Sequence, residues 1–112
     1  MRKARITAIV IGLIAAGCAS ARRSEPIAGP LPEVSSEVVA GRLLFQRNCN
    51  ACHVHGEAGL GPAINDKPLP AFMIRMQVRN GLGAMPSFPE KDLSPNDLDK
   101  VIAYLETLRD HG

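Results

Sequence analysis

Residues 54–69 show neither a helical nor a strand pattern, and this segment most restricts how the chain can fold. It contains three glycines and two prolines, which interrupt both kinds of element. A structureless loop of this length is uncommon inside a compact domain. The chain has only 112 residues, with no Trp, three Phe and one Tyr, so its own side chains supply a small core. We therefore expect the loop to wrap a non-polypeptide group or to be held by a covalent staple.

One helix is predicted before this loop and another after it. The first begins at Ser35 or Ser36, either of which can cap it, and Glu37 is favourable in its first turn. Its apolar face combines residues spaced by three and four: Val38, Gly41, Phe45 and Cys49. The second helix covers residues 70–79, with Pro70 in the first turn and Asn80-Gly81 as the stop signal.

A third helix near the C-terminus has the clearest pattern. Ser94 supplies the cap and Pro95 occupies the first helical position. The apolar stripe that follows comprises Leu98, Val101, Ile102, Leu105 and Leu108. No segment alternates with the period of two that strands require. The predicted fold class is therefore all-α. Met73 and Met76 of the second helix are predicted to be core side chains.

The first 17 residues have the features of an export signal. Arg2, Lys3 and Arg5 precede an apolar run over residues 6–16, which is short for a membrane span. Ile-Ala-Ala-Gly-Cys, ending at Cys18, resembles the lipobox of bacterial lipoproteins, in which the cysteine is acylated.

An alternative site for removal of this signal lies a few residues further on. Ala19-Ser20-Ala21 matches the pattern for ordinary signal peptidase, and cleavage after Ala21 would release an unanchored periplasmic protein. The first reading places the protein on the periplasmic side of a bacterial membrane, held there by lipid on Cys18.

The remaining chain divides into a tether and one domain. Residues 18–35 are rich in proline and predict an extended tether. The domain is expected over residues 36–109, followed by a tail at 110–112. The formal net charge of the whole chain is +2, and its basic residues form no block outside the N-terminus, which argues against nucleic-acid binding.

One motif in the domain points to specific chemistry. Cys49, Asn50, Ala51, Cys52 and His53 form Cys-x-x-Cys-His, the attachment signature of c-type haem. Two thiols at this spacing can each add to a haem vinyl group, and the next residue offers an imidazole to the iron. We therefore predict one haem c, bound covalently through Cys49 and Cys52, with His53 as an iron ligand.

Three other uses of the motif stay open from the residues alone. A disulfide between Cys49 and Cys52 suits an oxidising compartment. A thioredoxin-like redox pair expects neighbouring strands, and no strand pattern is present. A zinc site would have to add His55 or His111 to the motif's own ligands, because the domain contains no second cysteine pair.

Met85 is the predicted second iron ligand. It lies on an irregular stretch in which Gly81 and Gly83 permit close approach of the backbone to a flat group and Pro86 restricts the chain. A thioether can occupy the sixth position of haem iron, and His/Met ligation raises the reduction potential. His55 follows His53 too closely to reach the opposite haem face, so we interpret it as a surface residue.

With these residues in view, the sequence resembles the class I cytochromes c, especially the short bacterial ones, over about residues 37–108. The matching elements arrive in family order: Gly41 and Phe45, Cys49, Cys52 and His53, Gly61-Pro62, residues 80–88 with Met85, and Tyr104-Leu105. The resemblance implies three main helices wrapped around one covalent haem with long irregular loops.

The resemblance also implies specific contacts. Gly41 would let the first and last helices cross closely, with Phe45 packing near Tyr104. The Pro62 carbonyl would accept a hydrogen bond from the His53 ring. Partners of the haem propionates are not assigned by the resemblance; Arg75 and Arg79 are candidates from their place on the second helix.

The resulting functional hypothesis is a monohaem electron carrier, not an enzyme. Iron bound by His53 and Met85 has no open position, so no small-molecule substrate is expected, and the partners are a protein electron donor and acceptor. An alternative is the haem subunit of a larger periplasmic dehydrogenase or oxidase. A haem-based sensor is a further alternative, but it would need a distal acid–base residue, and none neighbours Met85 in the sequence.

Overall fold

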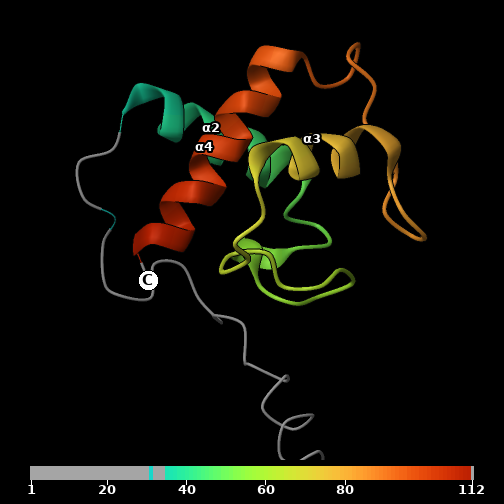
Figure 1. Cartoon of the computed structure of the whole chain (residues 1–112), viewed down its shortest axis with the longest axis horizontal. Coiled ribbons are helices and arrows are strands. Elements are labelled where there is room, and N and C mark those ends of the chain that lie inside the picture. The colour runs from blue at the N-terminus through green and yellow to red at the C-terminus, as the bar shows by residue number, and fades with distance from the viewer. Residues whose placement is uncertain (1–30, 32–34, 112) are drawn as a thin grey trace, which may run out of the picture.

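The computed structural model describes residue 31 and residues 35–111. The elements in chain order are α2 (Ser36–Asn48), the 3₁₀ turn η1 (Val54–Gly56), α3 (Ala71–Asn80) and α4 (Pro95–His111) (Figure 1). The predicted signal peptide, acylation at Cys18, cleavage after Ala21 and nearly all of the tether lie outside the described residues. Within the described part of the chain the fold is all-α, as predicted, with a single isolated bridge between Leu82 and Met85.

Local signals account for the helix starts. The Ser35 hydroxyl accepts a hydrogen bond from the Val38 N–H at 3.3 Å, which satisfies a donor at the start of α2. The Ser94 hydroxyl does the same for the Asp97 N–H at 3.1 Å at the start of α4. Hydrogen bonds from Lys100 and Ser94 lower the pKa of the Asp97 carboxyl. Both caps therefore stand where the sequence predicted them.

Two helix ends differ slightly from expectation. Pro70 has extended backbone angles and caps α3 from outside, rather than forming part of its first turn. The helix stops at Gly81, whose φ of 68° is unfavourable for other residues. α4 continues to His111, so residues 110 and 111, predicted as part of a tail, are helical.

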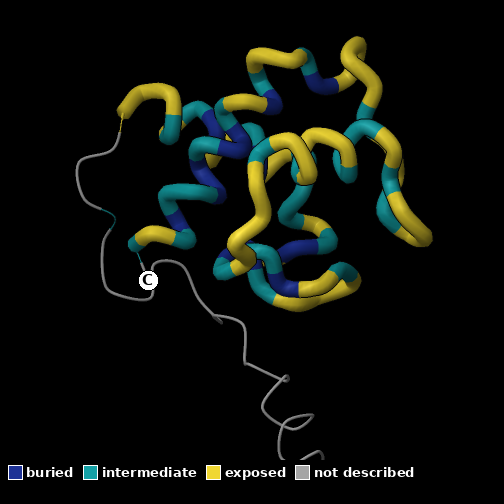
Figure 2. Tube along the Cα trace, in the orientation of Figure 1, coloured by how far each residue is buried: buried dark blue, intermediate teal, exposed yellow. Residues whose placement is uncertain are grey.

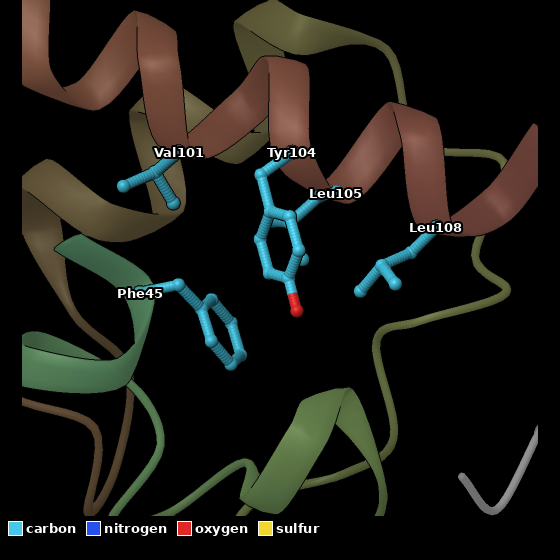
Figure 3. Close-up of a cluster of buried hydrophobic side chains, with 5 residues drawn as sticks. All are labelled: Phe45, Val101, Tyr104, Leu105 and Leu108. Atoms are coloured by element: carbon cyan, nitrogen blue, oxygen red, sulfur yellow. The ribbon is translucent and has the colours of Figure 1, made fainter. Parts of the chain in front are cut away.

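The crossing of α2 and α4 forms the centre of the core (Figure 1). Gly41 faces the backbone of α4 so closely that a Cβ atom there would overlap the Lys100 carbonyl oxygen. Beside this contact the Phe45 and Tyr104 rings pack with centroids 5.5 Å apart and planes inclined at 56°. The close crossing and the aromatic contact implied by the resemblance are both confirmed. The buried cluster around them comprises Phe45, Val101, Tyr104, Leu105 and Leu108 (Figure 3).

α3 and the segment after it pack on another part of α4. Leu93, Leu98 and Ile102 form a second buried cluster. Four half-buried neighbours from α3 and the following loop cover it: Ala71, Ile74, Val78 and Phe88. None of the helices in the described part of the chain is long and apolar enough to span a membrane.

The outer side of α3 is apolar as well. Phe72 is 66% exposed, Met76 is 56% exposed and Met73 is 39% exposed. The prediction that Met73 and Met76 belong to the core is therefore wrong. The exposed stretches of α3 and of the loop after η1 stand out in Figure 2. The loop itself forms no helix or strand beyond η1, as its glycines and prolines predicted.

Candidate cofactor-binding site

The Cys-x-x-Cys-His motif forms a tight turn at the end of α2. The N–H groups of Cys52 and His53 both donate to the Cys49 carbonyl, at 3.1 and 3.0 Å. Cys49 itself caps α2 by donating to the Phe45 carbonyl at 2.8 Å. The helix packed on α4 thus fixes where the motif begins, and the turn keeps its three reactive side chains on one short piece of backbone.

The His53 imidazole is buried and held from two sides. Its Nδ1 lies 2.8 Å from the Pro62 carbonyl oxygen, the hydrogen bond that the resemblance implied. A carbonyl can only accept, so Nδ1 carries the proton and Nε2 keeps a lone pair. A Cβ at Gly61 would overlap the His53 ring, so glycine is required for this approach. The tautomer leaves Nε2 as the nitrogen that could bind a metal.

The two thiols of the motif are not joined in a disulfide. Cys49 packs against the Phe45 cluster, and Cys52 lies nearby. Burial, with a smaller contribution from Cys52, raises the pKa of the Cys49 thiol to about 11. The Cys49 side chain of the unmodified polypeptide is therefore a neutral thiol at physiological pH. Among the described residues, no group of three or more His, Cys, Asp or Glu side chains could hold a metal ion, so the zinc alternative lacks ligands there.

Met85 stands on a short loop that leaves α3 and returns to it. Leu82 and Met85 exchange backbone hydrogen bonds of 3.1 and 3.0 Å across the turn at its tip. The Phe88 N–H then donates to the Val78 carbonyl at 2.9 Å, which closes the loop against the helix. The half-buried Met85 side chain is thus presented from a loop with a defined path.

Gln77 contacts Met85 and was missed from the sequence. Its side-chain Nε2 donates to the Met85 sulfur at 3.7 Å, near the limit for a weak hydrogen bond to sulfur. The signal that could have found it is its place one turn before the end of α3, directly ahead of the Met85 loop. An amide beside the thioether reduces the electron density that the sulfur can donate.

Both arginines considered for the haem propionates have protein partners. Arg75 forms an ion pair with Asp99 on α4 at 2.8 Å. Arg79 donates to the Phe88 and Leu93 carbonyls, at 2.8 and 2.6 Å. His55 lies on the surface, as predicted, and its backbone N–H donates to the Asn50 side chain at 2.8 Å.

The donors on these two segments suit haem c. The motif turn supplies two unbridged thiols and a buried imidazole with a fixed tautomer. The loop after α3 supplies a thioether, and imidazole with thioether is a ligand pair found on haem iron. Large apolar side chains on the loop after η1 and on the loop after α3 are exposed in the polypeptide, Leu60 at 86% and Leu82 at 74%. A large apolar group could cover such side chains, so the residues present fit a covalent haem.

Comparison with known proteins points the same way. The family described as cytochrome c oxidase, cbb3-type, subunit III, matches residues 36–105. The 4-cresol dehydrogenase [hydroxylating] cytochrome c subunit of Pseudomonas putida is 34% identical over 82 residues, 73% of this chain and 72% of its own. Cytochrome c6 of Gloeothece citriformis (strain PCC 7424) is 33% identical over 66% of this chain and 74% of its own. Cytochrome c6 of Cyanidium caldarium is 35% identical over 70% and 77%. No solved structure gives a significant match.

Proposed function

Because this chain belongs to the class I c-type cytochromes, we propose that it carries single electrons through iron held between His53 and Met85. The haem would be bound covalently by Cys49 and Cys52. Bound haem supplies a reversible one-electron couple. The polypeptide would position the two iron ligands, His53 and Met85, and surround the haem.

The hydrogen bond between His53 and Pro62 is the observation that carries this assignment. It selects the tautomer with a free Nε2 and holds the ring against Gly61. A ligand oriented by the protein keeps its place in both charge states of the metal, which favours electron transfer with little rearrangement. Met85 on its closed loop plays the same part from a separate segment. If His53 and Met85 both bind the iron, no position would remain on it for a substrate, so we assign a carrier rather than an enzyme.

The test is the visible spectrum of the protein, expressed together with a haem-attachment system. We expect a pyridine haemochrome typical of two thioether bonds, and a weak far-red band from sulfur-ligated ferric iron. Covalent haem without the far-red band would remove Met85 from the proposal. Absence of covalent haem would overturn the proposal as a whole and return Cys49 and Cys52 to disulfide chemistry.

A second candidate function is that of the cytochrome subunit of a larger dehydrogenase. The relative from Pseudomonas putida is named as such a subunit, and the match extends over 72% of that protein. The electron-carrying chemistry would be the same, and the difference lies in whether the partner stays bound. Purification of the tagged protein from its own cells decides between the two: a stoichiometric dehydrogenase that remains through gel filtration supports a subunit, whereas a monomeric haem protein supports a diffusing carrier.

We further propose that Cys18 anchors the protein to the periplasmic side of a membrane. Support comes from the sequence, where Cys18 follows Ala-Gly at the end of an apolar run. A Cys18→Ala variant is expected to leave the membrane fraction in which the unaltered protein is found. If the variant stays in that fraction, acylation at Cys18 is not what anchors the protein. If the unaltered protein is never found there, cleavage after Ala21 replaces the lipid anchor in this proposal.

A further inference from the structure

Arg79 connects the end of α3 to two points of the chain beyond Met85. One guanidinium nitrogen, Nη1, donates to the Phe88 carbonyl at 2.8 Å and to the Leu93 carbonyl at 2.6 Å. A terminal guanidinium nitrogen carries two hydrogens, so it can serve both acceptors. Hydrogen bonds from a charged donor are stronger than those between neutral groups. This side chain therefore holds three segments of backbone together.

The two carbonyls that Arg79 contacts belong to well-anchored residues. Leu93 is 2% exposed and lies in the cluster that joins α3 to α4. Phe88 packs against the same cluster, and its N–H is bonded to Val78. Arg79 thus fixes the point at which the Met85 loop ends, from the same helix on which the loop begins.

Met85 lies between those two ends. The chain leaves α3 at Gly81 and turns between Leu82 and Met85. It is bound again to α3 at Phe88 through the contacts of Val78 and Arg79. A loop whose ends are held together samples fewer conformations than one with a free end. Fixing Phe88 consequently restricts how far Met85 can move away.

We propose that Arg79 is a positioning residue for Met85, one that sets how firmly the thioether competes with outside ligands for the iron. This inference rests on the proposed function. A competing ligand binds only when Met85 has moved aside, so its apparent affinity scales with the fraction of molecules in that state. Loosening the loop raises that fraction, and the apparent affinity rises with it.

The probe is imidazole added to the ferric haem-loaded protein, followed by loss of the far-red sulfur band. We expect Arg79→Met to bind imidazole about tenfold more tightly than the unaltered protein, because two charge-assisted hydrogen bonds are lost. Arg79→Lys keeps a charge that can reach one carbonyl, so its affinity should fall between the two. Arg75→Met, on the same helix but bonded to Asp99, is the matched control and should leave imidazole affinity unchanged.

A further control separates positioning from general stability. Leu108→Ala weakens the cluster around Phe45, whereas the hydrogen bonds of Arg79 reach the Phe88 and Leu93 carbonyls. Imidazole affinity is measured for each variant at the same number of degrees below that variant's own melting temperature. Under this condition Arg79→Met should still bind imidazole more tightly than Leu108→Ala. Equal affinities in those two variants, or an unaltered affinity in Arg79→Met, would overturn the inference.

Failure of one variant to accumulate does not remove the test. If Arg79→Met is not obtained, Arg79→Lys is compared with Arg75→Lys, and a rise in imidazole affinity confined to the former supports the inference, whereas equal affinities overturn it. The spectrum of the unaltered protein reports the proposed function separately. Covalent haem with its far-red band stays present there even if Arg79 proves to have no influence on Met85.

Discussion

A Met85→Ala variant is expected to keep its covalent haem but to lose the far-red sulfur band and to bind carbon monoxide rapidly when reduced. Attachment depends on Cys49 and Cys52, which the substitution does not touch, whereas removal of the thioether opens the sixth iron position. The reduction potential should fall by on the order of 100 mV, a modest part of the roughly 0.8 V range that axial ligands span. Spectra, carbon monoxide titration and redox potentiometry measure the three effects.

The other methionines of the domain provide the control. Met73 and Met76 lie on the exposed side of α3, and neither has a hydrogen-bond contact with the motif turn among those described. Met76→Ala should therefore keep the sulfur band, the resistance to carbon monoxide and the potential. A far-red band that persists in Met85→Ala but disappears in Met76→Ala would mean that the wrong thioether had been assigned to the iron.

A Gly41→Ala variant is expected to lose at least about 3 kcal/mol of the free energy of unfolding. The new methyl group would overlap the Lys100 backbone carbonyl, which cannot rotate away as a side chain can. The two helices must separate, and the packing of Phe45 on Tyr104 loosens with them. Forcing extra atoms into a well-packed contact costs about 1–3 kcal/mol, and more where backbone is involved. For a domain of this size a loss of about 3 kcal/mol lowers the melting temperature by about 12–24 °C.

Gly83→Ala is the matched control for that substitution. Gly83 has a φ of 58°, and a Cβ there would meet no atom within 4 Å, so only backbone strain is added. Strain of this kind costs about 1–2 kcal/mol. Thermal melts of the haem-loaded proteins should therefore rank Gly41→Ala well below Gly83→Ala. Equal melting temperatures would show that α2 and α4 do not need their close crossing.

The helix caps and the apolar stripe of α4 show why much of this fold could be predicted from the sequence. Capping by Ser35 and Ser94 acts between residues three apart, so the sequence contains the whole interaction. The stripe on α4 is equally local, because residues at spacings of three and four share a face in any helix. All five of its predicted members are buried: Leu98, Val101, Ile102, Leu105 and Leu108.

The same local reasoning failed on α3. Its apolar residues lie on two sides of the helix, and periodicity groups them without saying which group faces inward. Contact with α4 decides which side of α3 faces the core. Ile74 and Val78 pack on the cluster that contains Leu98, and Phe72 and Met76 remain exposed. Assigning Met76 to the core was an error of this kind, since a methionine is apolar enough for either side.

By itself, then, the sequence determined which segments are helical and contained the motif that we propose holds the haem. The motif from Cys49 to His53 and the helix signals each act within a few residues, where covalent spacing sets the geometry. Tertiary structure alone decided how the two proposed iron ligands, His53 and Met85, are supported. Gln77 reaches the Met85 sulfur, and Arg79 reaches the Phe88 and Leu93 carbonyls. These contacts depend on the path by which irregular backbone returns to α3, and that path follows from the packing of α3 and Leu93 on α4, which no spacing along the chain specifies.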